Sequence, residues 1–288
     1  HRDLHSFPTR RSSDLTFSKN ILPFGIPCDI VLSADNISMK YLRMSREIYF
    51  ISDVHLGSGG PGADDQVKLE RLKGLFDHLP AKDGRLYILG DLFDFWFEYR
   101  TVVQIEHLEM IGLLRSLRDR GMEIDLLVGN HDYWIGNFLQ KRLGIGIHRG
   151  PVVIEQDGRR FYLAHGDGLG RGDLGYKVLK LLIRNPLTIG LFGLLHPDLG
   201  VPLARWFSRF SRRHLTRGKY TDPSPLVEVA QKKFSEGFDY VVLGHTHRPH
   251  RHQAGSRVYL NLGDFMEHFT YGAYHDGHLT LENIKPEP

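Results

Sequence analysis

Short runs of β-branched and aromatic residues recur along the chain from residue 47 onwards. Each run has the length and composition of a β-strand, and six are found, at 47–52, 85–89, 124–128, 161–164, 240–243 and 258–260. Between the early runs, apolar residues return at helical spacing, at Leu69, Leu72, Phe76 and Leu79 and again at Leu108, Ile111, Leu114 and Leu117. Strands that alternate with helices predict a layered α/β architecture with much parallel pairing.

The first forty-odd residues differ from the rest of the chain. Residues 1–15 are polar and aperiodic, without the charged-then-apolar order of a signal peptide, and they resemble translated sequencing-adapter DNA. We therefore expect residues 1–43 to be a non-native or disordered leader, with the natural start at Met44 and one domain over residues 44–288. No apolar run reaches the ~20 residues that would span a bilayer. The single cysteine, Cys28, excludes an internal disulfide.

Positive charge is concentrated in one segment, residues 170–220. It holds ten Lys and Arg against Asp173 and Asp198, in a chain whose formal net charge is only +3. An anionic partner is expected to dock there. Leu, Ile and Phe are interleaved with these cations, which is typical of an amphipathic segment rather than of the polar basic stripe of a nucleic-acid binder. No nucleic acid and no protein partner are expected.

Five of the predicted strands run directly into motifs that carry polar side chains. The motifs are Asp-Val-His (53–55), Gly-Asp (90–91), Gly-Asn-His-Asp (129–132), His-Gly-Asp (165–167) and Gly-His-Thr-His (244–247). Loops at the carboxyl ends of parallel strands converge on one crevice, and glycine lets the backbone turn tightly there. Asp-Val-His and Gly-Asp are common as ordinary turns, but five motifs in order, each closing a strand, predict one functional site.

The side chains of these motifs have the chemistry of metal ligands. The candidates are Asp53, His55, Asp91, Asn130, His165, His245 and His247. Carboxylate, imidazole and amide donors without thiolate suit Mn²⁺, Fe, Zn²⁺ or Mg²⁺. Seven ligands are too many for one tetrahedral ion but suit two ions that share a carboxylate. Residues two apart, as in Asp-x-His and His-x-His, project to the same side of an extended segment. A metal pair suits phosphate esters and anhydrides, since it activates water and neutralises developing charge.

The ordered set of motifs resembles the calcineurin-like metallophosphoesterase superfamily over residues 46–283. The resemblance implies an α/β fold with four αββα layers, in which two sheets pack together between helices. It also implies that Asp53, His55, Asp91 and His247 hold one metal. The second metal would be held by Asp91, Asn130, His165 and His245, so that Asp91 is the bridge. His131 would assist the leaving group or contact phosphate beside Asn130, and Asp132 would orient His131. Two divalent ions, with Mn²⁺ preferred, are the implied cofactors.

Within the superfamily, further motifs resemble the group of UDP-2,3-diacylglucosamine diphosphatases of lipid A synthesis. These motifs are residues 88–96, 164–167, 173–176 and 244–249. The resemblance implies a helical, lipid-facing cap at about 170–220, an acylated nucleotide-sugar substrate, and a cytoplasmic enzyme on the inner face of the inner membrane. The residues expected to contact the substrate are Asp173, Tyr176, Arg213, Arg217 and Lys219.

His131 departs from this narrower pattern, in which arginine is typical at that position. A pyrophosphate bond expels a weakly basic phosphate, whereas an alkoxide leaving group needs an acid, and histidine can supply one. A different phosphodiester, nucleotide or phosphoprotein substrate therefore stays open as an alternative. A helical hairpin whose apolar residues pack on the domain is the alternative to a lipid-facing cap.

Overall fold

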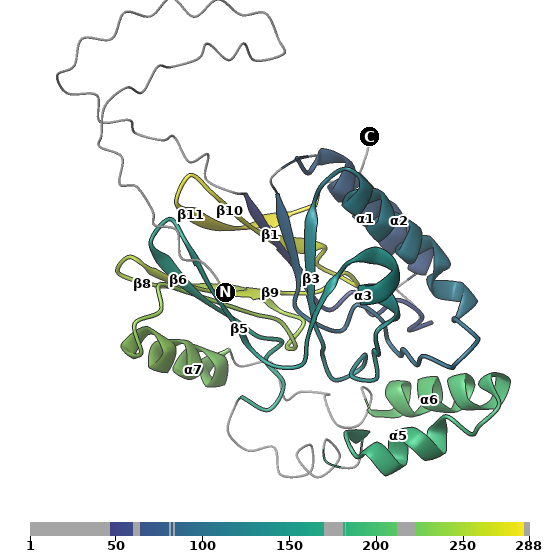
Figure 1. The fold of residues 1–288 in the computed structure, drawn as a ribbon. Coiled ribbons are helices and arrows are strands. Elements are labelled where there is room, and N and C mark those ends of the chain that lie inside the picture. The colour runs from purple at the N-terminus through teal and green to yellow at the C-terminus, as the bar shows by residue number, and fades with distance from the viewer. Residues whose placement is uncertain are drawn as a thin grey trace, which may run out of the picture. The chain divides into compact units, whose positions relative to one another are not determined.

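The computed structural model describes residues 47–59, 64–80, 82, 84–169, 181, 183–211 and 223–284, all within one unit of the chain, Met44–Pro288. The predicted leader, residues 1–43, lies outside the described residues. The described chain forms two sheets with helices on their outer faces (Figure 1). None of the described helices is long and apolar enough to cross a membrane.

The first sheet has six strands in the order β11-β10-β1-β2-β3-β4. Four of them pair in parallel: β1 (Ile48–Ile51), β2 (Arg85–Ile88), β3 (Glu123–Leu127) and β4 (Gly146–His148). The two remaining strands are β10 (Thr270–His275), which pairs antiparallel with β1, and β11 (His278–Asn283), which pairs antiparallel with β10. The register sets Ile51 opposite Ile88. The loops that follow β1 and β2 therefore leave the sheet side by side.

The second sheet has five strands in the order β5-β6-β7-β9-β8. Its three inner strands are parallel: β6 (Arg159–Leu163), β7 (Tyr240–Leu243) and β9 (Arg257–Leu262). The antiparallel edge strands are β5 (Val152–Gln156) and β8 (Pro249–Ala254). Leu163 stands opposite Val242, so the loops after β6 and β7 also emerge together.

Helices cover the outer face of each sheet. The first sheet carries α1 (Asp65–His78), α2 (Leu108–Asp119) and α3 (Phe138–Leu143), and the second carries α7 (Ser224–Ser235). The α1 helix begins where the Asp64 side chain accepts the Gln66 N–H, a common N-cap. A short 3₁₀ turn, η1 (Ile105–His107), precedes α2. The α2 helix buries Met110, Leu114 and Leu117, whereas Leu108, expected on its apolar face, is exposed.

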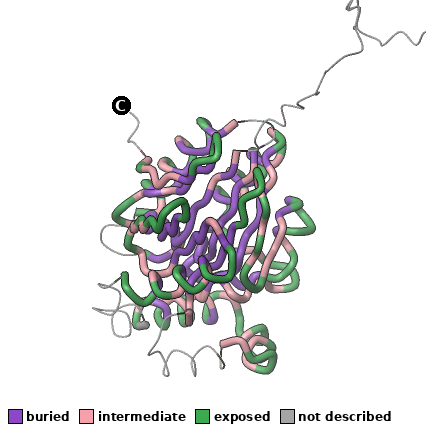
Figure 2. The backbone as a smooth tube through the Cα atoms, turned by 90° about the vertical axis from the view of Figure 1, so that its left-hand side faces the viewer, coloured by how far each residue is buried: buried purple, intermediate pink, exposed green. Residues whose placement is uncertain are grey.

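Three apolar cores separate the four layers. Successive residues of β7 show the arrangement: Tyr240 and Val242 face the core between the sheets, and Val241 and Leu243 face α7. A third core lies between the first sheet and α1–α3. Figure 2 shows the buried positions along the central strands and exposed ones on the outer helices and loops. The predicted αββα architecture is confirmed.

Two helices of the segment predicted as a cap are described, α5 (Pro186–Phe192) and α6 (Pro197–Ser211). Asn185 caps α5 by accepting the Leu187 N–H, and Pro186 follows it at the first helical position, where proline costs no hydrogen bond. The two helices and the turn between them expose several large apolar side chains: Leu187, Leu191, Leu194, Leu195, Leu199, Leu203, Trp206, Phe207 and Phe210.

Candidate metal centre

The five motifs follow five strands, three in the first sheet and two in the second. Asp53, Asp91 and Asn130 come after β1, β2 and β3 of the first sheet, and His165 and His245 come after β6 and β7 of the second. Because the strands within each set are parallel, each sheet delivers its motif loops at one edge. Motif side chains from different sheets contact each other, for example His247 and Asp53, so the two edges meet.

Two motif glycines leave room for the acidic side chains. A Cβ at Gly129 would overlap the Asp91 carboxylate and stand 2.6 Å from the Asp91 backbone nitrogen. A Cβ at Gly244 would overlap the Ser52 hydroxyl and the Asp53 carboxylate. At both positions the glycine provides space for a buried acid from a neighbouring loop.

Five of the seven predicted ligands have φ in the left-handed region, which costs a residue with a side chain about 1–3 kcal/mol. They are Asp53 (54°), His55 (50°), Asp91 (52°), His245 (73°) and His247 (58°). Backbone hydrogen bonds between the first two motif loops hold this conformation, from Asp53 N–H to the Gly90 carbonyl (3.1 Å) and from His55 N–H to the Asp91 carbonyl (2.9 Å). Asp53 and His55 converge with positive φ at both, and not on the plain extended segment that their spacing suggested.

The first group of donor atoms comes from Asp53, His55 and His247. The Nε2 atoms of His55 and His247 lie 3.1 Å apart, and Asp53 Oδ1 lies 3.3 Å from the second of them. Asp53 Oδ2 accepts hydrogen bonds from the Ser52 hydroxyl and the His245 N–H. The buried Oδ1 has no hydrogen-bond partner among the described residues, as expected of an atom kept for a cation.

Asp91 connects this group to a second one. Its Oδ1 accepts the backbone N–H of His131 at 2.8 Å. Its Oδ2 lies 3.6 Å from His55 Nε2 and 3.3 Å from His165 Nε2. One oxygen is thus held by the protein, and the other lies between histidines from the two sheets, where a bridging carboxylate oxygen would be needed.

The second donor group contains His165, Asn130 and His245. His165 Nε2 lies 3.0 Å from Asn130 Oδ1, and His165 Nδ1 lies 2.8 Å from the Leu89 carbonyl oxygen. A carbonyl oxygen only accepts, so Nδ1 carries the proton and donates to it. The other ring nitrogen, Nε2, points toward the neighbouring predicted metal ligands. The His245 ring meets the His165 ring edge-on at 5.0 Å between centroids. The structure therefore brings all seven predicted ligands together.

The charges within this cluster suit metal binding. Burial alone would raise the pKa of Asp53 and of Asp91, but the surrounding histidines hold both pKa values well below the ordinary one. Burial would likewise lower the pKa of His165, but the Asp91 carboxylate raises it well above its ordinary value. In the metal-free protein a proton on His165 thus offsets part of the buried negative charge. Burial lowers the pKa of His245 to about 4, which leaves that ring neutral near pH 7.

The geometry and the donor types fit divalent cations. Two ligands bound about 2.1 Å from one ion, at roughly 90–110° to each other, are about 3.0–3.4 Å apart. The separations of His247 Nε2 from His55 Nε2, 3.1 Å, and from Asp53 Oδ1, 3.3 Å, fall in this range. Carboxylate, imidazole and amide donors favour hard or borderline ions.

The His131 ring lies beside Asp94. Its Nδ1 is 3.2 Å from the Asp94 carbonyl oxygen and 3.5 Å from Asp94 Oδ1, and the Ser208 hydroxyl of α6 lies 3.0 Å from the same nitrogen. Since a carbonyl accepts, Nδ1 donates, and Nε2 is the nitrogen available to a substrate. Burial lowers the pKa of His131 to about 3, so the ring is neutral near pH 7.

Asp132 was predicted to orient His131, but its carboxylate oxygens are hydrogen-bonded to backbone groups of two other residues. It is fully buried, and its two oxygens accept the backbone N–H groups of Gly129 (2.7 Å) and Leu92 (2.9 Å). It therefore ties the loop after β3 to the loop after β2. Burial and the nearby Asp91 charge raise the pKa of Asp132 to about 7.

Two supporting residues were not predicted. Asp94 Oδ1 lies 3.3 Å from Nδ1 of His55, so a carboxylate stands behind a predicted ligand, a common way to fix its ring. Lys68 of α1 is fully buried and donates to the His55 carbonyl (2.8 Å) and the Ser58 hydroxyl (2.9 Å). The second acid of Gly-Asp-Leu-Phe-Asp was a usable signal for Asp94, whereas Lys68 reads in the sequence as part of a solvated helix face.

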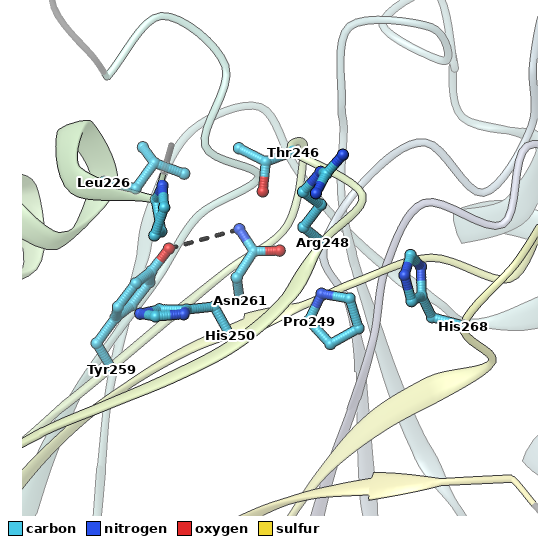
Figure 3. Close-up of a pocket in the computed structure, with 9 residues that line it drawn as sticks. Leu226, Thr246, Arg248, Pro249, His250, Tyr259, Asn261 and His268 are labelled. Atoms are coloured by element: carbon cyan, nitrogen blue, oxygen red, sulfur yellow. Dashed lines mark hydrogen bonds between the residues drawn. The ribbon is translucent and has the colours of Figure 1, made fainter. Parts of the chain in front are cut away.

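A cavity of about 450 Å³ borders the Gly-His-Thr-His loop (Figure 3). Its lining combines apolar rings and chains with polar tips: Pro223, Leu226, Thr246, Arg248, Pro249, His250, Tyr259, Asn261 and His268. The Asn261 amide donates to the Gly244 carbonyl at 2.8 Å, which ties the cavity wall to the loop that carries two predicted ligands.

The predicted substrate contacts Asp173, Tyr176, Arg213, Arg217 and Lys219 lie outside the described residues. The nearest described parts of the segment are α5, α6 and Arg184. The Arg184 guanidinium lies 3.2 Å from Asp167 of the His-Gly-Asp motif and 4.1 Å from the centre of the Tyr133 ring. A cation of the segment therefore does reach a motif loop.

The chain is similar in sequence to a known family and to several known proteins. The family model of calcineurin-like phosphoesterases matches residues 46–249. A protein named UDP-2,3-diacylglucosamine hydrolase from Porphyromonas gingivalis is 32% identical over 84% of this chain and 99% of its own length. Proteins of the same name from Pseudomonas putida KT2440 (35% identity, 72% of this chain, 84% of theirs) and Pseudomonas savastanoi pv. phaseolicola (36%, 76% and 88%) also match. Among solved structures, Yfce, a phosphoesterase from E. coli, aligns with a TM-score of 0.42 at 17% identity, over 83% of this chain and 93% of that one.

Proposed function

The chain belongs to the calcineurin-like phosphoesterase family, and on that premise we propose that it cleaves the pyrophosphate bond of UDP-2,3-diacylglucosamine. The products would be UMP and 2,3-diacylglucosamine 1-phosphate. The observation that carries the reaction class is that residues from both sheets meet in two groups that share Asp53, each with its ligand atoms within 4.8 Å of one another. The groups are Asp53, His55 and His247, and Asp53, Asp91 and His165. The choice of substrate is supported by the three relatives compared above, whose names all specify this nucleotide-sugar lipid.

Two divalent ions, preferably Mn²⁺, are the proposed cofactors. Asp53, His55 and His247 would hold one ion, Asn130, His165 and His245 the other, and Asp91 would touch both. When bound, such a pair activates water and neutralises the charge that develops on a phosphoryl group. The separations within the two donor groups and the unpartnered Asp53 Oδ1 support this assignment.

The remaining residues of the centre position the substrate. Asn130 and His131 stand together at the end of β3, and the backbone N–H of His131 keeps Asp91 in place. His131 Nδ1 is engaged by Asp94 and Ser208, so its Nε2 would face the phosphoryl group, and it would donate to a phosphoryl oxygen when the ring carries a second proton. Asp132 holds the loop on which both stand. We assign Asp173, Tyr176, Arg213, Arg217 and Lys219 to substrate binding on their positions in the sequence.

The α5–α6 pair is the proposed site of the acyl chains and of contact with a membrane surface. Leu187, Leu191, Leu194 and Leu199 are each more than 65% exposed, and such apolar surface next to cations suits an anionic lipid layer. The proposed location is accordingly the cytoplasmic face of the inner membrane, with peripheral attachment. A hairpin that only packed on the domain would bury these leucines.

The test is a comparison of Mn²⁺-dependent turnover of three substrates: UDP-2,3-diacylglucosamine, UDP-glucosamine and bis(p-nitrophenyl) phosphate. The acylated nucleotide sugar is expected to have by far the highest kcat/KM, with UMP as the released nucleotide. Equal kcat/KM for UDP-glucosamine would contradict the lipid substrate while leaving the reaction class intact. No metal-dependent hydrolysis of any of the three would contradict the reaction class.

His131 favours one second candidate, a hydrolase of another phosphodiester or nucleotide. A histidine beside the scissile bond can serve an alkoxide leaving group, which a pyrophosphate bond does not release. Preference for the simple diester over the acylated nucleotide sugar in the same assay would select this candidate.

A further inference from the structure

Ser208 of α6 is a buried hydroxyl on a helix that otherwise exposes much of its surface. Its exposed fraction is 8%, whereas Leu203 and Trp206 of the same helix are more than half exposed. The Ser208 side chain therefore enters the body of the protein. It enters at the metal centre.

The Ser208 hydroxyl lies between an acid and a histidine of that centre. It donates to Asp94 Oδ2 at 3.0 Å, and it lies 3.0 Å from His131 Nδ1. An ionised carboxylate only accepts, so the hydroxyl proton goes to Asp94 and the oxygen accepts from the Nδ1–H of His131. The Asp94 carbonyl oxygen, 3.2 Å from Nδ1, shares that N–H. The two hydrogen bonds form one directed chain from the ring through the hydroxyl to the carboxylate.

Asp94 also lies beside a predicted metal ligand. The other oxygen of Asp94, Oδ1, lies 3.3 Å from His55 Nδ1. The Asp94 carboxylate thus stands behind both the ring of His55 and the ring of His131, which meet edge-on at 4.7 Å between centroids. A hydroxyl that fixes the rotation of this carboxylate influences the direction of both rings.

A second contact fixes the helix that carries Ser208. Arg205, about one turn earlier on α6, forms an ion pair with Glu106 of η1, and its guanidinium lies next to Gly57 of the first motif loop. The α6 helix therefore contacts the loops of the metal centre through Arg205 as well as through Ser208. Of these two described residues, Ser208 is the one that touches the side chains behind the predicted ligands.

We infer that Ser208 is a positioning residue, through which the seating of α6 sets the orientation of the His131 ring and the Asp94 carboxylate. Because His131 is proposed to meet the phosphoryl group, this inference rests on the proposed function. It differs from acyl-chain binding by α6, since it predicts an effect on a substrate that has no acyl chain.

The experiment compares Ser208→Ala, His131→Gln and the double variant on bis(p-nitrophenyl) phosphate at saturating Mn²⁺. Ser208→Ala is expected to lower kcat about 10-fold, the lower end for residues that support a metal centre, with KM changed less than about twofold. In the His131→Gln background the same change should lower kcat by less than about threefold, because the effect through His131 is lost and only the effect through Asp94 and His55 remains. The matched control is Ser235→Ala on α7, whose hydroxyl donates to the Lys232 carbonyl within its own helix.

A second readout uses the metal-free protein. Long-range ¹H–¹⁵N spectra report which nitrogen of each histidine ring is protonated, and the His131 signals are identified by their loss in His131→Gln. The Nδ1–H tautomer should dominate in the parent protein, and Ser208→Ala should shift its signals while the Ser235→Ala spectrum stays unchanged.

Equal losses of kcat in both backgrounds, or His131 signals that Ser208→Ala does not move, would overturn the inference and leave Ser208 as a packing residue. A parent protein without metal-dependent turnover would contradict the proposed function instead. In that case the spectra of the metal-free protein would still decide whether Ser208 orients His131.

Discussion

The Asp91 carboxylate has two tasks, one for each oxygen: contact with the protein backbone and contact with the predicted metal ligands. Its Oδ1 is held by the His131 N–H, and its Oδ2 lies between His55 and His165. Changing Asp91 to Asn keeps the shape but removes the charge and sets an NH₂ group or a neutral oxygen between the histidines. We expect kcat to fall by at least about 100-fold, beyond the usual cost of losing a supporting residue, with bound Mn²⁺ reduced in elemental analysis. Asp119→Asn, at an exposed ion pair with Arg115, is the control. Parent-like activity and metal content in Asp91→Asn would contradict the bridging assignment.

Gly129 makes a second prediction at the scale of one residue. A Cβ here would overlap the Asp91 carboxylate, so Gly129→Ala must displace either the loop or the acid. The expected results are loss of metal-dependent activity and a free energy of unfolding lower by about 1–3 kcal/mol, as for other overpacked sites. Gly112→Ala on α2 is the matched control, since nothing lies within 4 Å of its Cβ, and it should stabilise the helix by up to about 1 kcal/mol. Chemical denaturation measures the free energy of unfolding, and a diester assay measures the activity. An active and stable Gly129→Ala variant would show that the loop can accommodate a Cβ beside Asp91.

The predicted ligands could be found in the sequence because each belongs to a motif that directly follows an apolar strand. Their conformation could not, because positive φ at residues such as His55 depends on hydrogen bonds to a loop about 35 positions away. The support of the first motif loop by Lys68, which donates to the His55 carbonyl, was equally hidden, since a lysine on a helix is normally solvated. Asp132 shows the converse: its neighbour in sequence, His131, is not its neighbour in hydrogen bonding.

At the scale of elements, burial on both faces decided which strands could be predicted. The runs that became β1, β2, β3, β6, β7 and β9 are apolar because cores lie on both sides of most of them. Edge strands have no such constraint. The β8 strand reads Pro-His-Arg-His-Gln-Ala and has no buried residue, and its pairing with β9 is fixed by the backbone ladder. A polar run of this kind has no strand signal in one sequence.

The α5 helix carries the prediction that belongs to this scale. Leu191 of α5 and Leu194 in the turn after it are 67% and 82% exposed, so replacing both with serine should change the free energy of unfolding by less than about 0.5 kcal/mol each. Turnover of the acylated nucleotide sugar should nevertheless fall several-fold through KM, because these side chains would bind acyl chains or lipid, while diester hydrolysis stays constant. Val153→Ser on β5, 54% exposed in the second sheet, is the matched control. An unchanged KM for the acylated substrate would remove α5 from the lipid-binding surface.

At the scale of the whole molecule, the metal centre lies where the two sheets meet. Asp53 and His55 come from the first sheet and His247 from the second, and the sheets otherwise associate through an apolar core. Ions shared between these residues would bind the folded protein but not the unfolded chain. They would also relieve the repulsion between two buried carboxylates and supply a partner for Asp53 Oδ1. Metal binding and the stability of the domain are therefore expected to be linked.

Removing the metal tests this linkage directly. After treatment with a chelator, titration with Mn²⁺ should raise the melting temperature, since a ligand at 100 times its Kd adds about 2.7 kcal/mol, or about 5–10 °C for a domain of this size. His247→Ala removes a donor from the second sheet and should abolish most of the rise, whereas His278→Ala, an exposed histidine at the start of β11, should retain it. Differential scanning fluorimetry measures all three proteins. Equal rises in His247→Ala and His278→Ala would mean that Mn²⁺ stabilises the protein from a different site, because the two variants differ in whether a donor has been taken from the place where the sheets join.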